Sequence, residues 1–460
     1  MPERDNIQGV GDFDLGQVAI LGSSGNIVNI TEQILELNIF QSIDSPFMSG
    51  NIMINDAVGL ASILPILGQE RLLFTFKTPS GFPINFDNYQ AVIYNVDKRF
   101  QGANRAQIFL LSFTTLENYR NTRTKVSKSF KGTSGEIVQE ILTDPNYLGT
   151  KKSLYVDDTI NVRTYVAPNI RPYQVIDNLR DESLTTQSEP HFLFYENPRG
   201  IHFRSLDSLI GQGGELCMPH VFTYKYQPSD DAKDIKDSLS TIVNWEIEDS
   251  SNTLLSGRAG MFASTLTCHD AYNKNIERFE YDYIEDMFKK RNSSNQDNKR
   301  YGPMISESPV DGEERLTEYT ASRQFVHPKS KATNHAEKWL QESNSRRIER
   351  EYFTLNIETF GNTNVMCGDI VDIIIPTNRE LSSSDVDSFP DPILSGRYLV
   401  TDLAHQVNYP SQQHTMVFTA MKDSVTNALP IENIKYPIER NSSNDIGLTQ
   451  EKRSLSQKTR

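Results

Sequence analysis

The first part of the chain alternates apolar and polar residues with a period of two. In the segment LELNIF, Leu35, Leu37 and Ile39 share one face, and RLLFTFK (71–77) repeats the pattern. This alternation predicts strands with one buried face. Three further stretches continue it: residues 51–55, 91–96 and 107–113. Short strands at this spacing predict an antiparallel barrel or sandwich over residues 1–130.

The period then changes. TSGE (133–136) has the spacing of a helix capping box, and apolar residues follow at helical intervals. A second helix is predicted to begin at Pro172, and ENPRG (196–200) between two aromatic-rich stretches predicts a hairpin turn. These elements form a predicted small α+β domain, a helix pair with a hairpin, over residues 131–215.

The rest of the chain divides by the same criteria. Residues 216–332 are predicted to be a β-rich middle region, with a polar insertion at 289–315 that has few apolar residues. A helix over 335–350 and a second set of alternating strands make up residues 333–422. Residues 423–460 are a polar arm, too poor in apolar residues to form a core.

One apolar segment, GLASILPIL (59–67), lies between two predicted strands. It is too short to cross a membrane, and Pro65 limits any helix there to one or two turns. We expect it to plug the end of the first barrel, either as a local lid or as a contact with another domain or subunit. The proposed packing or interface residues are Leu60, Ile63, Leu64, Ile66 and Leu67.

Composition and charge narrow the function. The chain has 46 Lys and Arg against 60 Asp and Glu, a formal charge of -14, which argues against a surface that grips nucleic acid. An acidic lining could still let DNA slide through a passage. Cys217, Cys268 and Cys367 form no CxxC pair, so neither a disulfide framework nor a zinc site is predicted. No stretch has the length of a membrane helix, and we expect the chain in the cytoplasm after synthesis.

No catalytic pattern is present. GxSxG and HExxH are absent, and GQGGELC (211–217) lacks the lysine of a phosphate loop. His405 and His414 could ligate a metal, but no third ligand is evident, so satisfied or exposed histidines are favoured. The basic stretch NYRNTRTKVSKSFK (118–131) is either a charged strand edge or, less favoured, a surface that stacks bases. We therefore predict no enzymatic activity, no cofactor and no metal site.

The order of four segments resembles the baseplate hub proteins of contractile-tailed phages. These proteins are related to the N-terminal part of type VI secretion spike proteins of the VgrG kind. The segments that carry the resemblance are residues 45–79, 171–206, 252–270 and the pair 353–376 with 395–407.

The resemblance implies a mainly β fold with α+β insertions, in which two tube-like antiparallel β-barrel domains flank a mixed middle region. It implies a structural protein of the virion, a homotrimeric ring that adapts the sixfold tail tube to the threefold central spike. DNA would pass through its channel without sequence-specific binding. The expected partners are the tail tube or tube-initiator protein, the central spike, the tape-measure protein and the baseplate wedge proteins, with no membrane.

Two alternatives stay open at this point. One is a tail-associated cell-wall hydrolase, which would need carboxylate or His/Cys groups that converge in a cleft. The other is the hub of a phage-derived contractile injection system that carries no genome. For the hub itself, the expected locations are the tail baseplate of the virion and the host cytoplasm during assembly.

Overall fold

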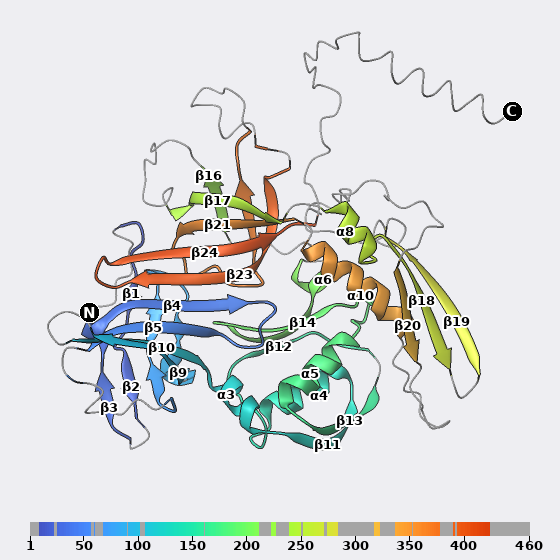
Figure 1. The fold of residues 1–460 in the computed structure, drawn as a ribbon, viewed down its shortest axis with the longest axis horizontal. Helices are drawn as coiled ribbons and strands as arrows, with labels where there is room; N and C mark the ends of the chain where they lie inside the picture. Colours follow the sequence, from blue (N-terminus) through green and yellow to red (C-terminus); the bar gives the residue numbers. More distant parts are fainter. Residues whose placement is uncertain are drawn as a thin grey trace, which may run out of the picture. The chain divides into compact units, whose positions relative to one another are not determined.

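The computed structural model of the chain is mainly β (Figure 1). All described residues belong to one compact unit within Met1–Thr426. The described residues are 9–22, 25–56, 59, 68–89, 91–101, 106–160, 162–210, 222–226, 239–249, 252–270, 274–283, 317–322, 336–351, 353–377, 390–391 and 393–423. The polar insertion 289–315, the segment 211–217 and the arm after Asp423 lie outside them. Among the described residues, no helix has the length and hydropathy to cross a membrane.

The N-terminal β unit consists of two sheets around one core. Its larger sheet has the order β4-β5-β10-β9-β6-β2-β3, and its smaller sheet has the order β1-β7-β8. Only Phe74 separates β6 from β7, so one extended segment leaves the first sheet and enters the second. The strands are β1 (Asp14–Leu15), β2 (Ala19–Leu21), β3 (Ile27–Asn29), β4 (Ile34–Ser42), β5 (Ser49–Asp56), β6 (Arg71–Leu73), β7 (Thr75–Lys77), β8 (Ile84–Asn85), β9 (Ala91–Gln101) and β10 (Gln107–Thr115), with short helices η1 (Thr31–Gln33) and α2 (Phe86–Tyr89).

Aromatic residues fill the core of this unit. The rings of Phe74, Phe86 and Phe113 lie 4.8–5.8 Å apart in the buried core. Gly50 on β5 makes this packing possible, because a Cβ there would come within 2.4 Å of the Phe113 ring and 2.3 Å of the carbonyl oxygen of Asn38. Any larger residue at position 50 would push the strands β4 and β10 apart.

The C-terminal β unit closes into a six-stranded barrel. Its order is β22-β16-β17-β21-β24-β23, and pairing of β22 with β23 completes the circle. Apolar side chains fill its centre, among them Leu355, Ile357, Val371 and Phe418. The strands are β16 (Phe222–Tyr226), β17 (Thr241–Asp249), β21 (Thr354–Phe360), β22 (Ile370–Ile374), β23 (Gly396–Asn408) and β24 (Gln413–Met421). The prediction of a mainly β fold is thereby confirmed.

One long strand joins the two β units. The first residues of β23, Gly396–Leu399, pair with β22, whereas residues 402–408 pair with β4 of the N-terminal unit. A shift of register against β24 between Val400 and Asp402 marks the change of partner. Such an irregularity bends and twists a strand. The N-terminal end of β23 can therefore pair with β22 of the barrel, while its C-terminal end pairs with β4 of the N-terminal unit. The two units therefore share one continuous sheet.

The α+β region packs its helices on two small sheets, of order β11-β13 and β12-β15-β14. Thr133 and Glu136 form the expected capping box at the start of α4. Pro172 opens α5, and β14 pairs with β15 through the ENPRG turn. The elements are α3 (Leu116–Arg123), β11 (Val126–Gly132), α4 (Ser134–Thr143), β12 (Leu154–Val156), β13 (Arg163–Ile170), α5 (Pro172–Asp181), β14 (Phe192–Asn197), β15 (Gly200–Ser205) and α6 (Leu206–Leu209).

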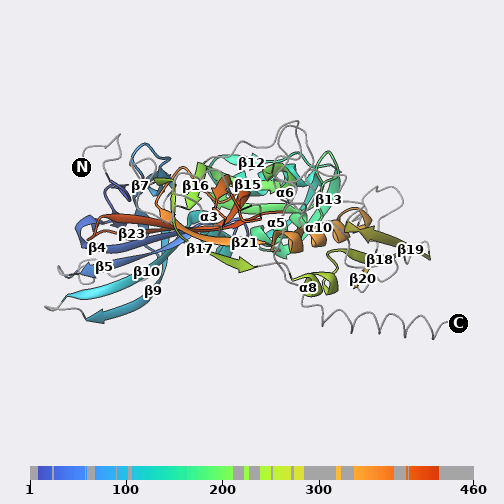
Figure 2. The same ribbon diagram turned by 90° about the horizontal axis from the view of Figure 1, so that it is seen from above.

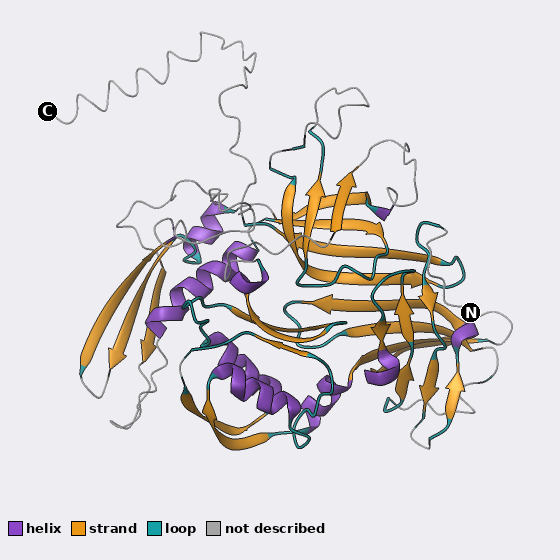
Figure 3. Ribbon diagram, turned by 180° about the vertical axis from the view of Figure 1, so that it is seen from behind, coloured by secondary structure: helices purple, strands orange, loops and turns teal. Residues whose placement is uncertain are grey.

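A last three-stranded sheet, of order β19-β18-β20, lies beside the long helix α10 (Figure 3). Gln341 on the helix donates to the backbone carbonyl of Ser264 on β18 at 3.0 Å. The helix confirms the prediction for residues 335–350. The elements are α8 (Thr253–Arg258), β18 (Ala263–Asp270), β19 (Asn275–Asp282), β20 (Thr317–Ser322) and α10 (Ala336–Arg350).

Candidate functional site

The shared sheet forms a wall of eight antiparallel strands in the order β17-β21-β24-β23-β4-β5-β10-β9 (Figure 2). One face of this wall carries the residues of the two cores, and the opposite face points away from both. Register places polar residues of adjacent strands side by side on the second face, which we call the outer face. One such row is Gln406, Asn38, Asn51, Ser112 and Asn95, from β23 to β9.

Side chains on the outer face bond to one another across the strands. Asn38 of β4 donates to Asn51 of β5 at 2.9 Å, and also to Glu36 of its own strand at 2.7 Å. On the barrel side, the hydroxyl of Thr419 donates to Glu248 at 3.2 Å. Cross-strand hydrogen bonds of this kind stabilise a sheet and also fix the positions of the polar groups.

The outer face is acidic. Its carboxylates between β17 and β4 are Glu36, Glu246, Glu248, Glu358 and Asp402. The seven strands from β17 to β10 contain one basic residue, Arg397, and it is buried in the barrel part of β23. In this part of the described chain, therefore, no Lys or Arg side chain balances the carboxylates on the outer face. A phosphate backbone near this surface would be repelled rather than held.

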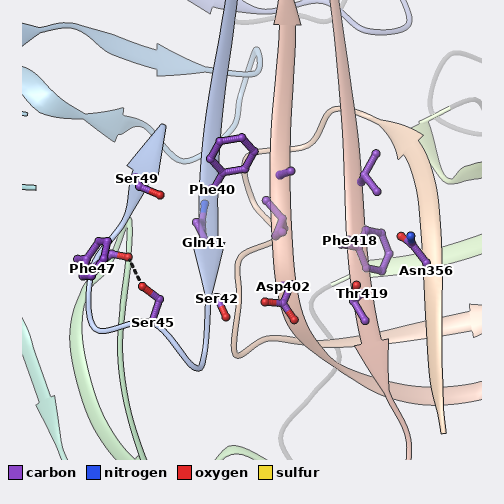
Figure 4. A pocket seen from close by; sticks show the side chains of 13 residues that line it. Phe40, Gln41, Ser42, Ser45, Phe47, Ser49, Asn356, Asp402, Phe418 and Thr419 are labelled. Atoms are coloured by element: carbon purple, nitrogen blue, oxygen red, sulfur yellow. Dashed lines mark hydrogen bonds between the residues drawn. The ribbon is translucent and has the colours of Figure 1, made fainter. Parts of the chain in front are cut away.

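A shallow hollow of about 290 Å³ lies on the outer face where the two units meet (Figure 4). Phe40 and Phe47 come from the N-terminal unit, whereas Asp402, Thr419 and Asn356 come from the barrel strands. The hollow holds one carboxylate and no second titratable group at its lining. Acid–base chemistry by a carboxylate pair, as in glycoside hydrolysis, therefore has no basis in this hollow.

A buried ionic cluster does bring two carboxylates together elsewhere. Lys152 bonds Glu117 and Glu196 at 2.6 Å each, and Thr115 at the end of β10 donates to Glu196 at 3.0 Å. Burial raises the pKa of Glu196 to about 6, although Lys152 opposes that rise. The adjacent hollow has about 20 Å³, room for about one water molecule and not for a sugar ring. The cluster therefore ties the N-terminal β unit to the α+β region.

A second buried cluster ties α10 to the rest of the molecule. Arg346 bonds Asp207 at 2.5 Å and Glu349 at 2.7 Å, and Tyr283 donates to Glu349 at 2.6 Å. Burial by itself would lower the pKa of Arg346, but the two carboxylates raise it overall, so the guanidinium stays charged. Arg350, on the next turn, pairs with Asp44 after β4 at 2.8 Å. The Arg346–Asp207 and Arg350–Asp44 pairs each connect regions far apart in sequence.

The two strand histidines, His405 and His414, are fully buried, and one ring nitrogen of each forms a hydrogen bond with the other ring. Nδ1 of His405 and Nε2 of His414 are 3.1 Å apart, and Phe76 packs edge-on against both rings. Burial lowers the pKa of His405 to about 3, so the pair is neutral. Gly361 lies against His414, where a Cβ would come within 1.9 Å of the ring. Within the described residues, no group of three or more His, Cys, Asp or Glu side chains has the arrangement of a metal site.

The structure corrects one expectation from the sequence. The basic stretch 118–131 was assigned to a strand edge, but its first part belongs to helix α3 and only its second part to strand β11. Arg120 explains the difference, because it reaches from the helix to the carbonyl oxygens of Leu148 and Gly149 at 2.6 and 3.0 Å. Tertiary contacts thus favour a helix where the charge pattern indicated a strand.

The apolar residues proposed for packing, Leu60, Ile63, Leu64, Ile66 and Leu67, lie outside the described residues. Their role stays a prediction. Sequence reasoning missed the outer face and both ionic clusters. The scarcity of Lys and Arg in these seven strands, where Arg397 is the single basic residue, was a readable signal for the outer face, whereas nothing in the local sequence marks Lys152 or Arg346 as buried.

Comparison with known proteins identifies the fold. No protein-family model matches the sequence, and no curated protein matches it either. Among solved structures, a tail protein from Neisseria meningitidis MC58 aligns with a TM-score of 0.51 and 11% identity, over 90% of this chain and 97% of that one. The 43 kDa tail protein of prophage MuSo2 from Shewanella oneidensis aligns with a TM-score of 0.52 and 9% identity, over 89% and 98%. The chain therefore has the fold of these phage tail proteins.

Proposed function

We propose that this chain is the structural hub of a contractile phage tail, a homotrimeric ring between the tail tube and the central spike. The fold shared with two phage tail proteins supports a place in a tail. Each chain supplies two β units, so three chains present six such units to a sixfold tube and threefold symmetry to a spike. These two units are the proposed tube-like domains.

The observation that carries the proposal is the outer face of the eight-stranded wall. It spans both β units, and it has five carboxylates between β17 and β4 without a basic side chain from β17 to β10 among the described residues. A surface of this kind suits the inner wall of a channel through which DNA and a tape-measure protein pass without binding tightly. Amide and hydroxyl groups keep such a wall hydrated, and the carboxylates keep phosphates away from it.

The proposed partners follow from this position. The tube or tube-initiator protein would lie at one end of the ring, the spike at the other, and wedge proteins around the outside. The two ionic clusters support a structural role: the one at Lys152 connects the N-terminal β unit to the α+β region, and the one at Arg346 connects α10 to α6.

The proposal can be tested by co-expressing the chain with the tail-tube and spike proteins of its own genome neighbourhood. We expect complexes with three copies of the chain, visible by mass measurement and as rings in electron micrographs. A chain that stays single in the presence of both proteins would contradict the hub. Digestion of purified cell wall, lost on mutation of a single residue, would instead favour the hydrolase.

A further inference from the structure

The two ends of the eight-stranded wall have unpaired edges. Among the described residues, β9 pairs with β6 only at Ala91 and Val92, so its residues 94–101 have β10 on one side and no strand on the other. At the opposite end, β17 pairs with β16 only at Thr241 and Ile242, and its residues 243–249 have β21 as their one described neighbour. Among the described residues, the backbone of each edge has no strand partner beyond these points, although Gly68 approaches the carbonyl oxygen of Tyr94. Backbone groups of an edge strand readily template another strand.

Both edges also expose apolar side chains. Tyr94 and Phe100 on β9 are 53% and 46% exposed, and Val243 and Ile247 on β17 are 49% and 44% exposed. Large apolar side chains on an edge strand favour association, and a chain that stays single usually protects such edges with charge, proline or a covering element.

The charges at the two edges are complementary. Register places Lys98 of β9 opposite Leu110, on the outer face, where it is exposed. Glu246 and Glu248 of β17 lie on the outer face as well, and both are exposed. The described residues give none of these three side chains an ionic partner within the chain, so each is available to a neighbour.

Strand direction allows the edges to join. The wall has eight strands, and each pair of neighbours within it is antiparallel. The first and last strands of an even-numbered antiparallel set run in opposite directions. When copies are related by rotation about an axis along the strands, β9 of one copy therefore meets β17 of the next in the antiparallel sense.

We infer that β9 residues 94–101 of one chain add to β17 residues 243–249 of a second copy, and that this junction closes the channel wall. Lys98 then lies beside Glu246 and Glu248 of the neighbour, all three on the outer face. The contact is head-to-tail, so each copy uses both edges once. This inference rests on the proposed hub and names the surfaces that would form its ring.

The strand spacing also gives a lower estimate of the width of the opening for a given number of copies. Strands lie about 4.8 Å apart, so a wall of three copies with strands along the axis has a backbone diameter of about 37 Å, and one of two copies about 24 Å. Side chains fill about 5 Å on each side, half the distance between packed sheets, which leaves about 27 Å and about 14 Å. Tilt of the strands, which closed barrels require, widens both openings further.

Cross-linking tests the junction directly. We would replace Lys98 and Glu246 by cysteine in a Cys217→Ser background, since Cys268 and Cys367 are buried. A short bismaleimide linker cannot join the two new cysteines within one chain, because seven strand spacings, about 34 Å, separate them. For the double variant we expect a ladder of cross-linked species that ends at three chains. Neither single variant should give cross-linked species.

Charge reversal provides the second readout. Lys98→Glu should raise the concentration needed for half-assembly by about tenfold, and adding Glu246→Lys should restore it. Asp402→Lys, an equally exposed change in the middle of the wall, is the matched control and should leave assembly unchanged. Circular dichroism confirms that each variant is folded.

The outcomes separate the junction from the hub. A trimer that gives no ladder and tolerates Lys98→Glu overturns the junction and leaves the hub intact. Ladders well beyond three chains support the junction and overturn the threefold ring. A wild-type chain that stays single, also with tube and spike proteins, overturns both.

Discussion

Removal of the buried guanidinium of Arg346 should destabilise the protein strongly. Its side chain is 1% exposed, and so is that of its partner Asp207, while Glu349 is nearly as buried. In Arg346→Met, two buried carboxylates would lose their cation and a side chain of similar length would fill the space. Breaking a buried pair in this way costs about 3–5 kcal/mol, because an uncompensated buried charge remains.

Urea unfolding followed by tryptophan fluorescence can measure this loss. The chain has two tryptophans, and Trp339 lies on α10 itself, two turns before Arg346, so Trp245→Phe isolates its signal. Arg347→Met is the matched control: the residue is adjacent and exposed, and its guanidinium donates to Asn344 at 3.1 Å. That change should alter the free energy of unfolding by less than about 0.5 kcal/mol.

A compensated variant tests the cause. Arg346→Met combined with Asp207→Asn and Glu349→Gln removes the guanidinium and the two carboxylates that bond it, and we expect it to recover more than half of the loss. Burial already raises the pKa of Glu349 in the intact cluster. The single variant should therefore recover stability as the pH falls and its carboxylates take up protons. A loss below about 1 kcal/mol, or a triple variant no better than the single one, would refute the charge-based reasoning.

Three further changes test other parts of the molecule. Replacing Glu36, Glu358 and Asp402 by lysine should make the assembled ring retain DNA in a filter-binding assay. With three phosphate contacts, the affinity for DNA should fall about 40-fold between about 50 and 200 mM salt. The control variant, with Gln or Asn at the same positions, should retain no DNA. Burial lowers the pKa of His405 from 6.5 to about 3, so its neutral form stabilises the fold above pH 6.5, and this stabilisation is lost as the pH falls. Between about pH 7.5 and about pH 5 the free energy of unfolding should fall by about 2 kcal/mol for this reason. In His405→Gln, this contribution should be missing from the pH dependence of urea unfolding. Leu64→Asp should lower solubility, and if the chain remains folded but no longer assembles in mass measurements, the apolar segment is an interface rather than a local lid.

Local sequence determined the individual elements of this protein. Alternation of Leu72 and Phe74 with their neighbours predicted one-sided burial, and Thr133 with Glu136 predicted the start of α4. Both patterns depend on residues within a few positions of one another, because strand pleat and helix capping are local geometry. The acidic balance likewise indicated a surface that does not hold DNA. Helix α3 shows the limit, since Arg120 finds its acceptors 28 and 29 positions away.

Only the tertiary structure decided how these elements combine. No local pattern indicates that β23 changes partner from β22 to β4, or that Arg346 meets Asp207 across 139 positions. Each strand alone could pair with several others, so local sequence does not select the partner. The partner is selected by the packing of side chains over the whole chain. The outer face and its two open edges exist only once that pairing is set. Local patterns thus predict which residues face inward and how acidic the chain is, whereas the pairing of distant strands places the carboxylates on one wall.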